Sequence, residues 1–312
     1  MIQRIYSDLE PFLQKGRVLV IYGPRRVGKT TLVQAYLQTT PWKYKLDSGD
    51  NIRTQQILSS QDFSTILGYI EGYDLLVIDE AQQIPNIGQA LKIIVDQRPD
   101  IRVIATGSSS FDLMNQIGEP LTGRKRTLTL YPVSQIERRL DMNEHELRES
   151  LPESLVYGSY PEVLTVKTKN QKRELLTELA HAYLLKDILM LEQVKGSKYL
   201  LDLLKLLAFQ IGKEVSYQEL GRQLGLSVKT VQRYLDLLEK AFVVIRVGGY
   251  SRNLRSEVVR KSKYYFFDTG LRNAVIDQFN DLENRSDIGE LWENFLFIER
   301  LKKRAYQEIY AT

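Results

Sequence analysis

The fold of the N-terminal half follows from residues 21–37, IYGPRRVGKTTLVQAYL. Residues 16–22, GRVLVIY, form a short apolar run rich in β-branched side chains, which predicts a buried strand. The glycine loop GPRRVGKT follows at 23–30, and TLVQAYLQ at 31–38 has the spacing of a helix. A strand, a glycine-rich loop and a helix in this order are the context that the phosphate-binding pattern G-x-x-x-x-G-K, followed by Ser or Thr, requires.

This loop predicts a nucleotide site that uses Mg²⁺. Gly23 and Gly28 permit backbone conformations that a Cβ would block, and loop amides at a helix N-terminus favour anionic oxygens. We expect Lys29 to reach the β- and γ-phosphates and the Thr30 hydroxyl to ligate Mg²⁺. The two loop arginines occupy unconstrained positions, where a solvent-facing role is the alternative. The expected nucleotide-binding residues are Gly23, Pro24, Arg25, Arg26, Val27, Gly28, Lys29, Thr30 and Thr31.

Two adjacent acidic residues are expected to bind Mg²⁺ and the attacking water in the same site. The run YDLLVIDEAQQIP, residues 73–85, is apolar until it reaches Asp79 and Glu80. At the carboxyl end of a strand, Asp79 is placed to hold the Mg²⁺ shell, and Glu80 to orient and polarise the attacking water. A GTP-specific site would call for an N-K-x-D element, which the chain lacks. ATP is therefore the expected nucleotide.

Two further polar residues are candidates for the hydrolysis site. The run DIRVIATGSSSFDLM, residues 100–114, predicts a strand beside the Asp79 strand, with Ser108 near the γ-phosphate as a polar sensor. The two serines after Ser108 are expected to cap the next helix. Arg124 precedes a further strand and is a candidate to stabilise charge on the transferring phosphoryl group, in its own subunit or a neighbour's. A plain basic surface cluster with the next two residues is the alternative.

The strand pattern predicts an α/β fold for the first domain. Parallel strands with helical crossovers make a doubly wound sheet, which binds ligands at the carboxyl ends of its strands. We expect this P-loop domain to cover residues 1–135 and a helical lid or connector to follow at 136–195. The expected strands are 16–22, 42–47, 74–79, 101–107 and 127–131.

The second half predicts a winged helix-turn-helix domain over residues 196–280. In residues 215–247, Ser216 and Glu219 form a capping box for a short helix, Gly225 makes the turn, and Ser227 caps a longer helix. The strands FVVIRV and KSKYYFFD, with the basic loop between them, would form the wing. Double-stranded DNA is a possible partner, and a packing module against the nucleotide domain is the alternative. The candidate DNA contacts are Lys229, Thr230 and Arg233 on the second helix and Arg252, Arg255, Arg260 and Lys261 in the wing.

The composition limits the number of domains and the kinds of chemistry that the chain can carry. The 312 residues suggest two or three domains, and 43% hydrophobic with 26% charged residues is ordinary for a globular protein. The absence of cysteine excludes disulfides and thiolate chemistry, and only His145 and His181 could ligate metals through imidazole. We expect no membrane span, no secretory signal and a cytoplasmic location. The net charge of +4 does not by itself indicate nucleic acid.

Eight motifs in order carry a family resemblance: GPRRVGKTTL, LLVIDEAQ, ATGSSS, LTGR, LYPVS, YGSYPEVL, YYFFDTGLRNAV and GELWENFLFIERL. The chain resembles the prokaryotic AAA-type (ASCE-class) ATPases that carry a winged helix and a C-terminal domain of unknown function. The resemblance implies an ATP-dependent protein. It supports Gly28, Lys29, Thr30, Asp79 and Glu80 as the nucleotide and catalytic set, with Ser108 as sensor and Arg124 as a candidate arginine finger.

The resemblance has one departure, at the C-terminal end. Members of this family usually continue into a domain like those of restriction endonucleases, with an Asp and a Glu-x-Lys on its strands. Residues 281–312 would be the truncated start of that domain. Glu293 matches the family's helix-borne acid, but the other metal-binding carboxylates are missing, so we expect no nuclease activity.

Two functions remain open on sequence alone. The first is a Mg²⁺-dependent ATPase that associates with nucleic acid through its winged helix. The second is a nucleotide-gated protein-interaction switch, in which the winged helix packs or docks and DNA has no role. A protein partner or a homo-oligomer is compatible with both, since an arginine finger supplied in trans requires a neighbour.

Overall fold

The computed structural model describes residues 2–108, 117–183, 197–248 and 262–307. It divides the chain into two compact units, Met1–Tyr131 and Pro132–Thr312. The division falls four residues before the expected boundary at 135. The three parts expected after that boundary, 136–195, 196–280 and 281–312, lie in the second unit.

The first unit is built on a five-stranded sheet whose strand pairs are all parallel. The strand order is β2-β3-β4-β1-β5, so β4 lies between β3 and β1. The expected pairing of β4 with the Asp79 strand is therefore confirmed. The strands are β1 Val18–Tyr22, β2 Tyr44–Ser48, β3 Leu75–Asp79, β4 Arg102–Gly107 and β5 Lys125–Thr129.

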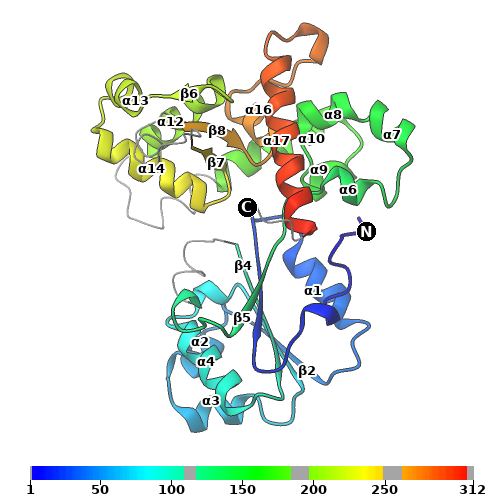
Figure 1. The fold of residues 1–312 in the computed structure, drawn as a ribbon, viewed down its shortest axis with the longest axis vertical. Helices are drawn as coiled ribbons and strands as arrows, with labels where there is room; N and C mark the ends of the chain where they lie inside the picture. The colour runs from blue at the N-terminus through cyan, green and yellow to red at the C-terminus, as the bar shows by residue number, and fades with distance from the viewer. Residues whose placement is uncertain (1, 109–116, 184–196, 249–261, 308–312) are drawn as a thin grey trace, which may run out of the picture. The chain divides into compact units, whose positions relative to one another are not determined.

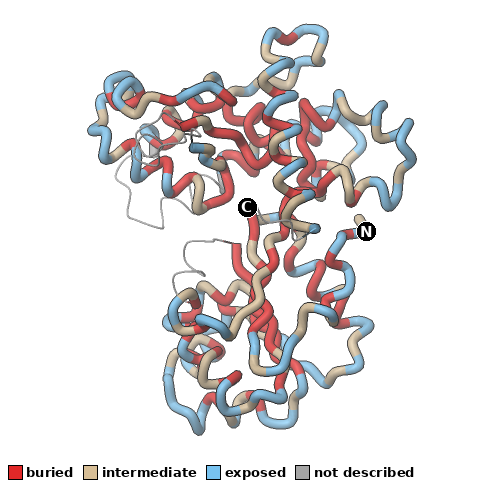
Figure 2. Tube along the Cα trace, in the orientation of Figure 1, coloured by how far each residue is buried: buried red, intermediate tan, exposed pale blue. Residues whose placement is uncertain are grey.

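Helices cover both faces of this sheet (Figure 1). Helix α1, Lys29–Leu37, lies on one side, and α2 Ile52–Ser59, α3 Phe63–Tyr69 and α4 Ile87–Gln97 lie on the other. Alternate strand residues such as Val20 and Ile78 pack with α2, α3 and α4 in one buried cluster, because successive side chains of a strand point to opposite faces. Figure 2 shows the burial concentrated along the strands.

The second unit contains many short helices and a small sheet. Strands β7 Val244–Val247 and β6 Glu214–Val215 both pair antiparallel with β8, Ser262–Phe266. The helices before this sheet are α6 Gln135–Arg138, α7 Glu144–Glu149, α8 Leu151–Tyr157, α9 Pro161–Thr165, α10 Lys169–Glu178, the π-helical turn η3 Leu179–Tyr183 and α12 Ser197–Phe209. After it come α16 Thr269–Val275 and α17 Ile288–Tyr306.

Two helices lie between β6 and β7, and each begins at the serine cap that the sequence predicts. Helix α13, Tyr217–Leu224, is capped by the Ser216 side chain and ends at Gly225, whose φ of 67° is left-handed. Helix α14, Val228–Lys240, is capped by the Ser227 side chain. Residues 249–261, which join β7 to β8, lie outside the described residues.

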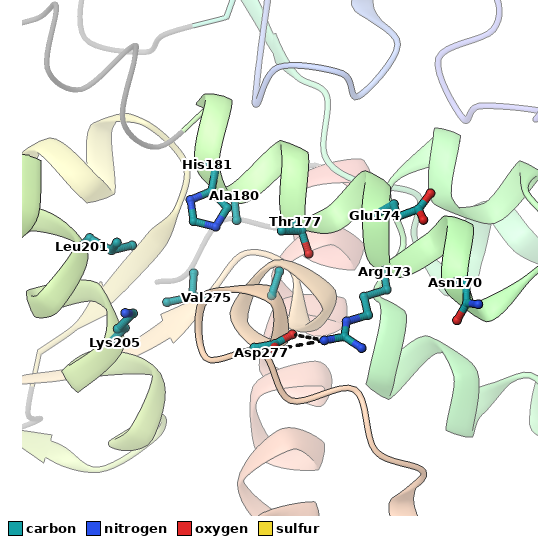
Figure 3. A pocket seen from close by; sticks show the side chains of 11 residues that line it. Asn170, Arg173, Glu174, Thr177, Ala180, His181, Leu201, Lys205, Val275 and Asp277 are labelled. Carbon is teal, nitrogen blue, oxygen red and sulfur yellow. Dashed lines mark hydrogen bonds and ion pairs between the residues drawn. The ribbon is translucent and has the colours of Figure 1, made fainter.

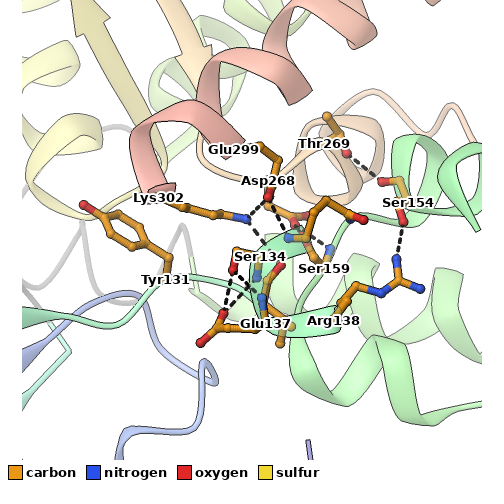
Figure 4. A network of polar contacts seen from close by, with 12 residues as sticks. Tyr131, Ser134, Glu137, Arg138, Ser154, Ser159, Asp268, Thr269, Glu299 and Lys302 are labelled. Carbon is orange, nitrogen blue, oxygen red and sulfur yellow. Dashed lines mark hydrogen bonds and ion pairs between the residues drawn. The ribbon is translucent and has the colours of Figure 1, made fainter. Parts of the chain in front are cut away.

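A buried polar network ties distant motifs of the second unit together (Figure 4). The Asp268 carboxylate accepts hydrogen bonds from the backbone N–H of Ser159 at 2.7 Å and of Leu271 at 3.0 Å. Gly158 lies so close that a Cβ there would be 2.0 Å from Asp268 Oδ1. Lys302 on α17 is 1% exposed and bonds to Glu299 at 2.8 Å. The motifs containing these residues therefore form the packed interior of one unit.

In the described parts of the chain, no helix combines the length and the apolar character that a membrane crossing requires.

Candidate nucleotide-binding site

The loop after β1 holds conformations that require glycine. Gly23 has a φ of 153°, and a Cβ there would lie 2.1 Å from the Leu130 carbonyl oxygen. Gly28 has a φ of 91° and is the N-cap of α1. Any other residue at these positions would clash or strain the backbone. The glycine spacing of the motif thus lets the loop pass close to residue 130 and turn into the helix.

Lys29 organises this loop from within. Its side chain is buried, and Nζ donates to the carbonyl oxygens of Gly23 at 3.0 Å and Pro24 at 2.8 Å. A buried ammonium requires such partners. The lysine therefore fixes the first two peptide units of the loop and places a positive charge beside them.

Arg4 holds the other end of the loop, a contact that sequence reasoning missed. The Arg4 side chain is buried, and Nη1 donates to the Val27 carbonyl at 2.6 Å while Nη2 donates to the Tyr131 carbonyl at 2.6 Å. A lone arginine 19 positions before the first loop glycine belongs to no sequence motif. Only the structure shows that it contacts the loop.

The structure brings Thr30 and Asp79 together. Thr30 Oγ1 donates to Asp79 Oδ2 at 2.7 Å. Thr106, at the end of β4, donates its hydroxyl to Asp79 Oδ1. Two predicted metal ligands, the Thr30 hydroxyl and the Asp79 carboxylate, are thus adjacent, and the Thr106 hydroxyl orients the carboxylate. Sequence reasoning missed Thr106, although its place before Gly107 at a strand end was a usable signal.

Glu80 is held beside Asp79 in a strained conformation. Its φ of 48° and ψ of 43° are left-handed, which costs a non-glycine residue about 1–2 kcal/mol. Its carboxylate accepts hydrogen bonds from Gln82 Nε2 and from Ser108 Oγ, the latter at 3.3 Å. Ser108 therefore lies next to Glu80, and its sensor role stays a prediction. Gln82 was missed because no pattern singles out one glutamine in EAQQ.

The residues present fit ATP and Mg²⁺. Gly28, the left-handed N-cap of α1, has no Cβ that could block access to the first turn of the helix. Phosphate oxygens are attracted to a helix N-terminus. Mg²⁺ bound with a nucleotide keeps waters and phosphate oxygens and needs only one or two protein ligands. Thr30 and Asp79 supply that number. No cluster of three or more His, Asp or Glu suited to a metal occurs in the described ranges.

Arg124 is the site residue that the structure does not bring to the loop. It precedes β5 directly, and Lys125 pairs with Val18 at the amino end of β1. The loop follows the opposite end of β1, about 13 Å away at 3.3 Å per residue. Arg124 instead forms an ion pair with Asp96, Nε to Oδ1 at 2.6 Å. The expectation that it acts in its own chain's site is corrected on this geometry, while a role in a neighbour's site stays a prediction.

The remaining loop residues divide by exposure. Pro24 and Val27 are buried, whereas Arg26 and Thr31 are exposed and Arg25 is half-buried. Arg26 has a left-handed φ of 57°. Both arginines lie on the loop, and their nucleotide contacts stay a prediction.

The DNA candidates are described only in part. Lys229 and Arg233 are exposed on α14, and Thr230 is half-buried in its first turn. The opposite side of α14, with Val231 and Leu235, is buried. All four predicted wing contacts lie outside the described residues: Arg252, Arg255, Arg260 and Lys261.

The second unit also contains a cavity of about 690 Å³ (Figure 3). It is lined by one face of α10, by His181 on the π-helical turn and by Lys205 on α12. Arg173 and Asp277, which both line it, form an ion pair at 2.9 Å. The cavity belongs to the second unit alone and shares no residue with the loop site.

The first unit has the parallel sheet and the phosphate-binding loop that P-loop domains share. Residues 15–138 match the AAA domain family, and residues 148–282 match a domain of unknown function, DUF8612. The chain is 28% identical to an uncharacterised protein of Mycobacterium tuberculosis, over 93% of this chain and 63% of that protein's length. An uncharacterised protein of Methanocaldococcus jannaschii is 24% identical, over 97% of this chain and 70% of its own.

The fold also occurs in a solved structure. The Walker-type ATPase PABY2304 of Pyrococcus abyssi superposes with a TM-score of 0.53 at 17% identity, over 83% of this chain and 91% of that one. The AAA-type P-loop fold is thus supported by a family match and by a solved structure.

Proposed function

We propose that this chain binds and hydrolyses Mg-ATP in its first unit and contacts double-stranded DNA through its second. The observation that carries the ATPase proposal is the hydrogen bond from Thr30 Oγ1 to Asp79 Oδ2 at 2.7 Å, with Glu80 as the next residue. It joins the loop threonine to the strand-end acids at one edge of the sheet, where open α/β sheets bind their ligands.

Each residue of this set has a role that its contacts support. Lys29 and the loop amides bind the phosphates, and Thr30 with Asp79 holds Mg²⁺, which neutralises charge on phosphate oxygens. Glu80 orients the attacking water and takes up its proton. Ser108 and Gln82 hold the Glu80 carboxylate in place. Arg124 would complete the site only from a neighbouring copy, as an arginine finger.

The DNA proposal rests on the two-sided character of α14. Its apolar side is buried, and Lys229, Gln232 and Arg233 are exposed together on the other side. In helix-turn-helix proteins the second helix enters the major groove with such a polar face. Lysine and arginine there would contact phosphates, and the wing would add further basic residues.

The alternative is a nucleotide-gated switch in which the same α14 face docks a protein. Val228 at the start of α14 is 39% exposed, so an apolar side chain adjoins the basic ones. A protein surface accepts that mixture as readily as DNA does. DNA binding that weakens as salt rises would distinguish a DNA partner from a protein partner.

Steady-state ATP hydrolysis with Mg²⁺, with and without mixed-sequence double-stranded DNA at low and moderate salt, tests the proposal. We expect Mg²⁺-dependent turnover that DNA stimulates, with stimulation fading as salt rises. The double variant Lys229→Ala, Arg233→Ala should lose the stimulation, and Arg148→Ala on the exposed face of α7 should keep it. Turnover indifferent to DNA, with no DNA binding at low salt, would favour the protein-docking alternative. Absence of any turnover would overturn the ATPase proposal itself.

A further inference from the structure

The Arg4 guanidinium joins two peptide groups that are far apart in the chain. Nη1 donates to the Val27 carbonyl and Nη2 to the Tyr131 carbonyl, each at 2.6 Å. The sequence separations are 23 and 127 residues. Arg4 is 8% exposed, so these charge-assisted hydrogen bonds are largely shielded from water. Such bonds are about twice as strong as neutral ones.

The first of these peptide groups belongs to the phosphate loop. The carbonyl of Val27 and the N–H of Gly28 form one rigid peptide plane, and in a trans peptide they point in opposite directions. Arg4 holds the carbonyl, so it also sets the direction of the Gly28 N–H, away from itself. Gly28 has a φ of 91°, which glycine adopts at little cost. Because glycine has no side chain, no steric clash at this residue prevents the Val27–Gly28 peptide plane from rotating.

The second peptide group is the joint between the two units. Tyr131 ends the first unit and Pro132 begins the second, so the carbonyl that Arg4 holds lies in the peptide that connects them. Gly23 adjoins the same segment, because its Cα approaches Leu130 too closely for a side chain. Beyond the joint, the Val133 N–H donates to Ser159 O at 2.8 Å and thereby belongs to the body of the second unit.

We propose that Arg4 is a positioning residue that couples the phosphate loop to the joint between the units. One guanidinium fork sets the Val27–Gly28 peptide, whose amide binds phosphate, and the Tyr131–Pro132 peptide. A nucleotide that draws the Gly28 amide toward its phosphates also fixes Arg4, and Arg4 fixes the joint. This inference rests on the proposed nucleotide binding and adds to it the route by which nucleotide state reaches the second unit.

Arginine is required for this role because the two acceptors are held by two different nitrogens. A lysine ammonium keeps the charge but not the planar fork. Arg4→Lys should therefore lose most of the coupling while preserving more of the fold than Arg4→Ala. Arg17→Ala is the matched control, since Arg17 is exposed at the amino end of β1 and bonds only to Gln14 among the contacts described.

The test measures ATP affinity, kcat and KM, and hydrogen exchange at the Val133 amide with and without saturating ATP. Loss of one charge-assisted hydrogen bond to the loop should raise KM and Kd for ATP about tenfold in Arg4→Ala. Wild type should show an ATP-induced change in exchange at Val133. Both Arg4 variants should lack that change even at saturating ATP, and Arg17→Ala should retain it.

The outcomes separate this proposal from the function on which it rests. Folded Arg4 variants that keep the ATP-induced change at Val133 would overturn the coupling, even if KM rises. Wild type that binds ATP but shows no change at Val133 would also overturn it. Wild type that binds no ATP would instead refute the proposed function. If Arg4→Ala does not fold, the comparison of Arg4→Lys with wild type tests the coupling.

Discussion

Thr30 and Asp79 are 49 positions apart, yet the Thr30 hydroxyl donates a 2.7 Å hydrogen bond to the Asp79 carboxylate. The contact exists because β1 and β3 are parallel and both end at one edge of the sheet, with β4 between them. Thr106 at the end of β4 donates to the other carboxylate oxygen. Three oxygen-bearing side chains thus meet at one edge of the sheet, and under the proposed function Thr30 and Asp79 would hold Mg²⁺ there.

Removing the Thr30 hydroxyl should weaken Mg²⁺ use rather than nucleotide binding as such. Thr30→Val keeps the shape of the side chain and deletes one metal ligand. We expect the Mg²⁺ concentration for half-maximal turnover to rise at least about tenfold, since one lost charged interaction is worth roughly 1.5–3 kcal/mol. Thr65→Val, at an exposed position on α3, is the control. Equal Mg²⁺ requirements in both variants would place the metal elsewhere.

Lys29→Ala should remove most nucleotide affinity. The substitution deletes the phosphate-binding charge and also releases the carbonyls of Gly23 and Pro24, so the loop loses its internal support. An increase in Kd for ATP of at least about tenfold is expected from the lost charged hydrogen bonds. Lys15→Ala, exposed before β1, should bind as wild type does. Binding by Lys29→Ala with unchanged affinity would mean that the loop is not the site.

Glu80→Gln should bind ATP and turn it over very slowly, because an amide cannot take up the proton of the attacking water. General-base catalysis contributes about 10²–10⁴-fold, so kcat should fall by about that factor while Kd changes little. Gln82→Ala should lower kcat less, since it removes only the amide that holds the Glu80 carboxylate. Gln83→Ala, at the exposed neighbouring position, is the control. Near-normal turnover by Glu80→Gln would assign the base to another residue.

Features that depend on neighbouring residues in the sequence could be predicted, whereas contacts between residues far apart in the sequence could not. The apolar runs predict the three inner strands β1, β3 and β4, because burial on both faces of a sheet leaves a continuous apolar signature. The edge strands β2 and β5 overlap their expected ranges, but they are only partly buried and carry more polar sequences. The contacts of Arg4 and Gln82 follow no local pattern, since they depend on which backbone carbonyl or carboxylate the fold brings near. The wide separation of Arg124 from the loop likewise depends on which end of β5 it occupies.

The second half illustrates the same limit at the level of whole elements. Local pattern predicts a connector, a winged helix and a terminal segment in succession. In the structure, Asn273 on α16 donates to the carbonyls of Leu155 and Val156 on α8, more than 100 positions earlier. Helical periodicity identifies each helix but does not reveal which helices pack together.

Gly158 should not tolerate a side chain. Its φ of 69° is left-handed, and a Cβ would lie 2.0 Å from the Asp268 carboxylate, which is buried and cannot retreat into solvent. Overpacking of this kind costs about 1–3 kcal/mol, and left-handed strain adds to it. Gly158→Ala should therefore lower the free energy of unfolding by at least about 2 kcal/mol in denaturant titrations. Gly289→Ala is the control, because a Cβ at Gly289 would meet no neighbouring atom within 4 Å and alanine favours helix.

Asp287 should stabilise the second unit in a pH-dependent way. Its carboxylate accepts from Arg272 Nη1 at 2.5 Å and from Arg285 Nε at 2.8 Å, and both arginine side chains are at most 2% exposed. Burial alone would raise the pKa of Asp287, but the hydrogen bonds and charges of the two arginines outweigh it and lower that pKa. Asp287→Asn leaves two buried guanidiniums without their counter-charge, and breaking a buried pair costs about 3–5 kcal/mol.

Because the folded pKa of Asp287 lies below the unfolded one, its contribution is present above the ordinary Asp value of about 3.9 and is lost as pH falls through the folded pKa. The difference in unfolding free energy between wild type and Asp287→Asn should therefore be constant near neutrality and shrink below about pH 4. Asp281→Asn breaks an exposed ion pair with Lys169 and should cost at most about 1 kcal/mol. Equal effects of the two substitutions at pH 7 would show that burial adds nothing to the Asp287 pair, and a difference that persists unchanged at pH 3 would show that its carboxylate charge is not the source.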